Sequence, residues 1–460
     1  MPELAVALVA LGTVAFGAVY PWAYMPLFAA AALTGGVALA RHGLTSTPRP
    51  VAYSLLAVGA AVLLQLVPLP RALLDRLSPH AGPILTAFSL TFGSDPTQPA
   101  PLSLNPAGTR TALLGLVALG LFLVGAAGRL SGASLRRLPR ALATFALPLA
   151  VFGIISREYR KNDLIYWFWR PEEGGGDLFG PFVNRNHFGG WMLMALCLLV
   201  GALFGQVERA LQDSAVRRRR LAWLSSAEAN GIVAMGLVVF GAVIALFWTV
   251  SRSAISGFVV AAAAFAWLAL TRHRFGATSR RASVLALGAV LLAGIAWRGP
   301  AELAQRFQDQ RNLVGRLDAW RDAWAVMRDF PLAGTGLNTY SDAMLFYQRS
   351  NPGFHLAQAH NDYVQLAAEG GLLVGIPAAV ALALLVRQIR RNLRAARAEA
   401  RGYWIRAGAA VGLLAIGVQE VFEFSLQVPA NALLCCVLAA VALAPVGAAP
   451  AGGHGNGGRP

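Results

Sequence analysis

The sequence predicts an all-α, polytopic integral membrane protein with about twelve transmembrane helices. Of its 460 residues, 56% are hydrophobic and only 13% are charged. Apolar runs of about twenty residues recur along the chain, and a helix of that length crosses roughly 30 Å of hydrocarbon. A backbone in lipid must satisfy its own hydrogen bonds, and these runs are too long for barrel strands, so each is expected to be a helix.

The expected spans follow one another along most of the chain, with the first two only weakly separated. They lie near residues 4–20, 25–40, 52–68, 111–128, 141–156, 187–205, 231–249, 254–270, 283–297, 371–387, 404–420 and 429–446. We expect one transmembrane domain, 1–446, with a large loop at about 298–370 between the ninth and tenth helices. The tail 447–460 is rich in Gly, Ala and Pro, a composition that predicts disorder.

The distribution of charge predicts the orientation. If both termini are cytoplasmic, the inner segments hold 23 of the 39 basic residues but only 5 of the 22 acidic ones. The positive-inside rule favours this arrangement, with the large loop in the periplasm. The arginine run 217–220 and the arginine-rich segment 387–406 are the strongest anchors. Because topology and anionic lipid explain these arginines, the pI of 11.1 does not indicate a nucleic-acid partner.

Two polar segments stand out on the outer side. One has the sequence AHNDY at 359–363, within the large loop, and the other has the sequence FGPFVNRNH at 179–187. Membrane helices need few such groups, so two on one side suggest a site for a polar, anionic substrate. In the second segment, Arg185 lies between Asn184 and Asn186. It could extend towards the interface as many arginines do, or bind phosphate oxygens through its planar fork.

The aromatic block 166–169, YWFW, precedes this segment, and it also has two interpretations. Such a block is typical of the belt of aromatic residues at a membrane interface. Sugar rings also stack on aromatic faces, so a glycan platform is the alternative.

Three further ionisable positions lie at the outer ends of predicted helices. Arg252 falls between two serines in a short outer turn, where it is either a charge in that turn or a functional group. Glu420 and Glu423 lie at the outer end of the eleventh span. They could pair with an arginine as a structural lock or support catalysis, and the sequence does not separate the two.

The residue types on the outer side favour one kind of chemistry. No HExxH or DxD-like cluster is present there, and no GxSxG elbow, so we expect neither a metal nor another cofactor. His360 and several arginines remain. Arginines can neutralise a departing diphosphate, and a histidine can accept the proton of an attacking hydroxyl.

These residues resemble a known family. The turn at 251–253, the stretch 316–336 and the segment 360–371 are similar to the O-antigen ligase and Wzy-type polymerase superfamily, and the similarity extends over about 235–390. One departure is Val374, where the family usually has a Gly. The resemblance implies a metal-independent glycosyltransferase of the bacterial inner membrane that moves a glycan from undecaprenyl diphosphate to an acceptor at the periplasmic face.

The resemblance also implies roles for individual residues. His360 is the implied catalytic residue, and Arg252 and Arg316 are the implied diphosphate-binding residues. Arg185 is added to them on charge and position. The supporting residues are expected to be Asn361, Asn184, Asn186, Glu420 and Glu423.

The acceptor stays open at this point. A ligase that uses lipid A–core is slightly preferred, because the chain has about twelve spans and a single large loop. A Wzy-type polymerase would use a second lipid-linked glycan, and a related branch glycosylates proteins. A transporter of lipid-linked sugars is a further alternative, but it predicts ionisable residues along the mid-bilayer helices.

Overall fold

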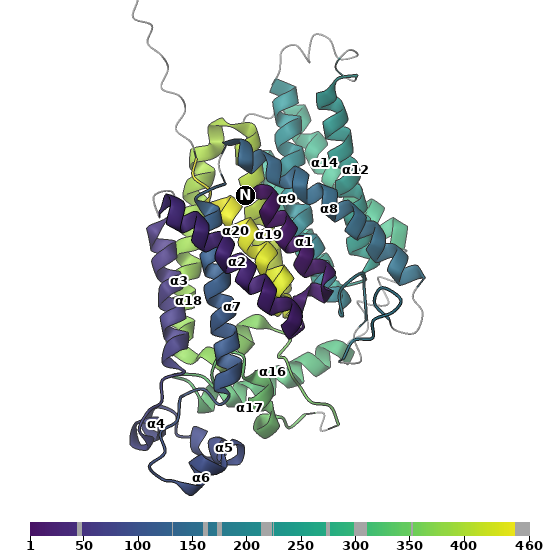
Figure 1. Ribbon diagram of the computed structural model, residues 1–460. Coiled ribbons are helices and arrows are strands. Elements are labelled where there is room, and N and C mark those ends of the chain that lie inside the picture. Colours follow the sequence, from purple (N-terminus) through teal and green to yellow (C-terminus); the bar gives the residue numbers. More distant parts are fainter. Residues whose placement is uncertain are drawn as a thin grey trace, which may run out of the picture.

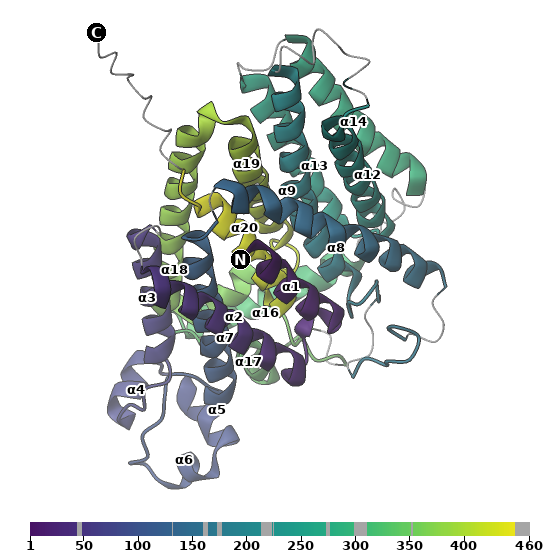
Figure 2. The same cartoon turned by 45° about the horizontal axis from the view of Figure 1, so that its top comes forward.

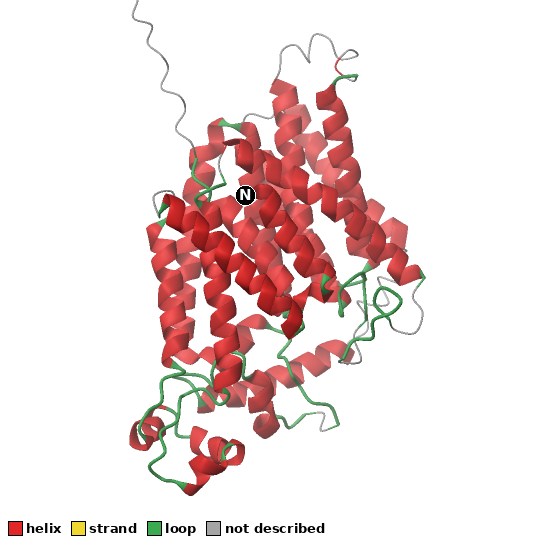
Figure 3. Cartoon of the chain, viewed as in Figure 1, coloured by secondary structure: helices red, strands yellow, loops and turns green. Residues whose placement is uncertain are grey.

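The computed structural model describes residues 1–43, 48–130, 132–159, 164–172, 177–212, 223, 225–272, 277–298, 311–350 and 353–446. The expected disordered tail 447–460 and the arginine run 217–220 lie outside the described residues. Within the described part, the chain forms helices and no strands, which confirms the all-α prediction (Figure 3).

The helices follow the expected order of spans. They are α1 (Pro2–Val14), η1 (Phe16–Ala18), α2 (Pro21–His42), α3 (Arg49–Leu64), α4 (Arg71–Leu77), α5 (Ala81–Phe88), α6 (Leu90–Ser94), α7 (Pro106–Ala127), α8 (Gly132–Glu158), α9 (Arg185–Gln212), α12 (Ala227–Trp248), α13 (Arg252–Thr271), α14 (Ala277–Arg298), α16 (Arg311–Asp329), α17 (Tyr340–Tyr347), α18 (Asp362–Ala395), η2 (Ala396–Ala398), α19 (Ala400–Gln419), η3 (Ser425–Gln427) and α20 (Pro429–Leu443). Each of the twelve expected spans therefore coincides with a helix.

Only some of the helices are long and apolar enough to be assigned as membrane spans. Among the described residues, seven helices are long and apolar enough to cross a membrane: α2, α7, α8, α9, α12, α13 and the helix that begins at Asp362. Shorter apolar helices include α1, α3 and α20. The count of twelve spans therefore stays a prediction. The first span is shorter than expected, because the backbone turns at Phe16 and Gly17, where φ is positive, and α1 ends at Val14.

Helix α9 lies at the centre of the bundle, and 94% of the most apolar stretch of this helix is buried (Figures 1 and 2). It packs along α19, and glycines on both helices make the approach close. A Cβ on Gly201 would lie 2.4 Å from the Trp404 oxygen, and one on Gly408 would lie 2.6 Å from the Cys197 oxygen. Small residues permit such backbone contact between membrane helices. The pair α9 and α19 therefore forms a rigid frame that runs from one end of the bundle to the other.

A second core lies beyond one end of the bundle. It joins α4, α5 and α6 to α16, α17 and the start of α18, through side chains such as Leu74, Phe92, Ala323, Phe330 and Tyr340. In Figure 1 these helices lie together below the bundle. The described part of the large loop predicted at 298–370 therefore forms one packed unit with the segment 69–104.

Candidate functional site

The start of α18 holds His360 in an unusual backbone conformation. Asn361 is the N-cap, and its Oδ1 accepts hydrogen bonds from the backbone N–H of Tyr363 (3.0 Å) and Val364 (3.1 Å). The peptide before His360 is bound on both sides. Trp320 Nε1 donates to the Ala359 oxygen (2.9 Å), and the Ala359 N–H donates to a side-chain oxygen of α18 (3.1 Å). His360 has φ of +50°, and these bonds hold it there.

A break in α18 fixes that helix against the loop after α16. At Gly371 the backbone leaves the helical region (φ 53°, ψ −155°). The groups freed by the break bond to the loop: Leu373 N–H donates to the Leu332 oxygen (2.8 Å), and Gly336 N–H donates to the Glu369 oxygen (2.9 Å). A Cβ on Gly371 would lie 2.5 Å from the backbone nitrogen at position 334. The loop and the histidine helix therefore interlock through backbone contacts that side chains would block.

Glu423 lies at the centre of a group of polar side chains from four separate segments. Its carboxylate accepts hydrogen bonds from Arg316 of α16, from Asn186 Nδ2 of α9 (2.7 Å) and from Ser253 Oγ of α13 (3.5 Å). The Glu423 side chain is only 1% exposed. Glu423 therefore forms an ion pair with Arg316.

His360 lies beside this carboxylate. Its Nδ1 is 4.0 Å from Glu423 Oε2, and its side chain is 35% exposed. The ring of Phe424 packs edge-on against His360 (5.0 Å between ring centroids) and against His187 at the start of α9 (4.7 Å). Phe424 therefore separates a reachable histidine from a buried one, a role that the sequence analysis missed. Its position directly after Glu423 was the available signal.

The environment shifts the pKa values of both His360 and Glu423. Burial lowers the pKa of His360 to about 4, and the positive charge of Arg316 adds to the effect. Burial raises the pKa of Glu423 to about 7, although Arg316 and Ser253 act in the opposite direction. His360 is therefore neutral at neutral pH, which is the state that a general base needs.

The predicted arginines approach the same end of the bundle, with different partners. Arg316 binds Glu423, as described above. Arg252 is the first residue of α13 and adjoins Ser253, which contacts Glu423. Arg185 is the first residue of α9, and its guanidinium binds Asp177 at 2.8 Å.

The remaining predicted residues join the helices around this group of side chains. Asn184 Oδ1 accepts from the backbone N–H of Asn186 (2.8 Å) where α9 begins, and the Asn186 oxygen accepts from Gln419 Nε2 (3.0 Å). The backbone oxygen of Glu420 accepts from the Asp362 N–H (3.1 Å), which attaches the start of α18 to the end of α19.

The aromatic block packs mainly against the N-terminal turn. The Trp169 ring stacks on Phe16 (4.9 Å between centroids), and Tyr166 Oη donates to the Val14 oxygen (2.6 Å). Trp167 and Phe168 are 47% and 75% exposed. Half of the block therefore serves packing, which leaves Trp167 and Phe168 for an interfacial or glycan contact.

No group of three or more His, Cys, Asp or Glu side chains that could hold a metal ion is present in the part of the chain that the structure describes.

Residues 237–379 match the family model described as O-antigen ligase, Wzy_C. The match covers less than half of the chain, but it includes Arg252, Arg316 and His360. Arg185 and Glu423 lie outside it. No curated protein matches the chain.

The matched region and the apolar helices agree with each other. The family supports a role for the protein in glycosyl transfer during O-antigen assembly, by a ligase- or polymerase-type enzyme that handles lipid-linked glycans. The helices fit a multi-pass protein of the bacterial inner membrane. Through residues 237–379, the chain is therefore similar to the O-antigen ligase family, Wzy_C.

Proposed function

We propose that the protein transfers a glycan from undecaprenyl diphosphate to an acceptor hydroxyl at the periplasmic face of the inner membrane, with His360 as the general base. The observation that carries this proposal is the group formed by His360, Glu423 and Arg316, which unites a neutral, reachable imidazole with a buried ion pair. The group lies at one end of the bundle and not at mid-bilayer depth, which favours an enzyme over a transporter of lipid-linked sugars.

The reaction forms one bond and breaks another. The acceptor oxygen bonds to the anomeric carbon of the glycan, while the bond from that carbon to the diphosphate oxygen breaks. The hydroxyl proton passes to His360, and undecaprenyl diphosphate leaves with the electron pair. Because His360 Nδ1 faces Glu423, Nε2 is the nitrogen left to accept the proton. The imidazolium then forms beside the Glu423 carboxylate, which stabilises it electrostatically.

The arginines bind the leaving group in this proposal. Arg252 and Arg316 each present a guanidinium fork that can bind phosphate oxygens in bidentate fashion. Arg185 takes part through its position at the start of α9, once its bond to Asp177 is shared with the substrate. The start of α9 also adds the partial positive charge of a helix N-terminus.

The acceptor that we propose is lipid A–core, which makes the protein an O-antigen ligase of lipopolysaccharide biosynthesis. A Wzy-type polymerase that extends an O-antigen or exopolysaccharide on a second lipid-linked repeat is the alternative, followed by a protein O-oligosaccharyltransferase. All three share the donor and the chemistry at His360, and they differ only in the hydroxyl that attacks.

A transfer assay in proteoliposomes distinguishes them. Undecaprenyl-diphosphate glycan is the donor, and lipid A–core or a second lipid-linked repeat is offered separately. We expect product on lipid A–core. A ladder on the lipid-linked acceptor would establish a polymerase instead, and transfer to neither acceptor would contradict both assignments.

A further inference from the structure

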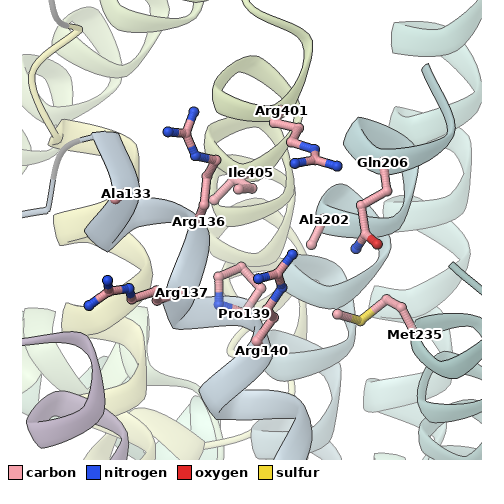
Figure 4. A pocket seen from close by; sticks show the side chains of 10 residues that line it. All are labelled: Ala133, Arg136, Arg137, Pro139, Arg140, Ala202, Gln206, Met235, Arg401 and Ile405. Carbon is pink, nitrogen blue, oxygen red and sulfur yellow. The ribbon is translucent and has the colours of Figure 1, made fainter. Parts of the chain in front are cut away.

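An arginine-lined pocket lies at the end of the bundle opposite to His360. It has a volume of about 180 Å³ and lies between α8, α9, α12 and α19. Its cationic lining comes from Arg136, Arg137 and Arg140 of α8 and from Arg401 of α19. Figure 4 shows Arg140 and Arg401 pointing toward each other, with Gln206 of α9 facing them.

Helices α9 and α19 connect the pocket to the candidate active site, and their length gives the distance between the two. Helix α19 runs from Arg401 near its start to Gln419 at its end, where Glu420 and Glu423 follow. Helix α9 runs from Arg185 in the candidate site to Gln206 in the pocket. At 1.5 Å per residue each path covers about 30 Å, the thickness of the hydrocarbon layer. The pocket therefore opens at the other face of the membrane and does not belong to the transfer site.

Positive charge exceeds negative charge in this pocket. Arg401 pairs with Glu228 at 3.2 Å, and Arg136 pairs with Glu399 at 3.4 Å. Arg137 and Arg140 form no salt bridge with another described residue. Arg401 Nε is buried and has no hydrogen-bond partner in the described part of the chain. Four guanidinium groups thus share two carboxylates, and this excess attracts an anion.

The other residues that line the pocket indicate which kind of molecule carries the anionic group. Ala202, Met235 and Ile405 supply apolar surface beside the arginines. The volume is below the roughly 300–1,000 Å³ of sites for drug-sized ligands, so a headgroup fits better than a whole substrate. Basic pockets between membrane helices on the cytoplasmic side suit phosphate headgroups, with the glycerol and acyl parts along the apolar side.

We propose that this pocket binds the phosphate group of an anionic phospholipid, such as phosphatidylglycerol. Arg140 and Arg401 bind the phosphate oxygens, Arg136 lies at the rim, and Gln206 donates a further hydrogen bond. The ligand joins α8 to α19 and so braces the central helix pair. Free phosphate offers the same chemistry without the apolar part.

Lipid binding to the purified full chain tests this proposal. Phosphatidylglycerol is titrated into protein in detergent micelles that contain phosphatidylcholine, and bound lipid per folded protein is read by native mass spectrometry. For Arg136→Gln/Arg140→Gln we expect a rise of about tenfold in half-saturating phosphatidylglycerol, because loss of the charge-assisted hydrogen bond from Arg140 to the phosphate costs about 1.5 kcal/mol. The thermal midpoint in phosphatidylcholine alone checks that the variant is folded.

A matched variant controls for general attraction between charges. Arg390→Gln/Arg394→Gln removes the same charge from α18, where the arginines lie along a single helix. We expect this variant to change half-saturation less than twofold. Equal losses in the two variants, or no loss in the pocket variant, would overturn the proposal. A separate arm adds inorganic phosphate. Displacement of the lipid by millimolar phosphate would support an anion site and would identify free phosphate, in place of the lipid, as its ligand.

Discussion

Glu423 Oε2 lies 4.0 Å from His360 Nδ1, and the other oxygen of the same carboxylate binds Arg316. One buried carboxylate thus connects the proposed base with a proposed diphosphate-binding residue. Glu423 follows α19, whereas His360 and Arg316 belong to the large loop. The contact therefore also attaches the loop to the bundle.

Removing Arg316 should destabilise the protein in a pH-dependent way. Arg316→Gln leaves the Glu423 carboxylate buried without its cation, at a cost of about 3 kcal/mol once it is ionised. Because burial already raises the pKa of Glu423 to about 7, the loss should be small at pH 5 and should grow as pH rises through 7. Thermal unfolding across this range measures it.

The double variant Arg316→Gln/Glu423→Gln is the control for that experiment. It removes both charges, so we expect it to recover most of the stability at pH 8. A double variant no more stable than Arg316→Gln would show that the ion pair does not explain the loss.

The pH dependence of transfer should follow Glu423 and not His360. The pKa of His360 is lowered to about 4, so the base is neutral at all pH values above about 5. Ionisation of Glu423 near pH 7 then supplies the charge that stabilises the imidazolium. We expect the initial rate to rise with pH with a midpoint near 7.

Glu423→Gln should remove that step from the profile. Its rate should be low and flat from pH 8 to about 5, and should fall only as His360 becomes protonated near 4. A midpoint near 6.5 in both proteins would instead indicate a histidine with an ordinary pKa, and would contradict the environment described for His360.

Trp320 should be needed to hold the backbone at His360. Trp320→Phe keeps the ring but loses the hydrogen bond to the Ala359 oxygen, which is worth about 1 kcal/mol. Because the neighbouring His360 has a positive φ, we expect the transfer rate to fall about tenfold with donor affinity unchanged. Trp324→Phe is the matched control, since Trp324 is 66% exposed on the same helix. Equal effects in both variants would argue against this positioning role.

The helix break should not tolerate a side chain. Gly371→Ala places a Cβ 2.5 Å from a backbone nitrogen at a positive φ, so a loss of stability of about 2 kcal/mol or more is expected. Gly375→Ala, four residues along α18, meets nothing within 4 Å and should be neutral or slightly stabilising. Thermal unfolding of the two variants in micelles compares them directly.

The helices could be predicted from local patterns, because the length of each apolar run can be read directly from the sequence. In the structure, Asn361 and Asn184 precede helices, and both side chains accept backbone N–H bonds. The sequence also contained His360, Arg252 and Arg316 in recognisable motifs. Their convergence at one end of the bundle follows from the alternating direction of successive helices.

Other features depend on contacts between distant residues. Arg185 could be predicted as a cation beside a helix, but its bond to Asp177 depends on how the connecting segment folds. Gln65 of the α3 end donates to the oxygens of Ala333 (2.7 Å) and Glu369 (2.9 Å), a bridge between three segments that no periodicity indicates. The partner of Glu423 was likewise one of several arginines until the fold was known.

The measurement that tests the central claim most directly is transfer by wild type and His360→Gln in proteoliposomes with EDTA present. Donor binding is measured on the same samples, so that loss of chemistry is separated from loss of affinity. We expect wild type to transfer glycan at an unchanged rate in EDTA, and His360→Gln to bind the donor normally while its rate falls by 10²-fold or more, which is the typical contribution of a general base. Full activity in His360→Gln, or loss of wild-type activity in EDTA, would contradict the account.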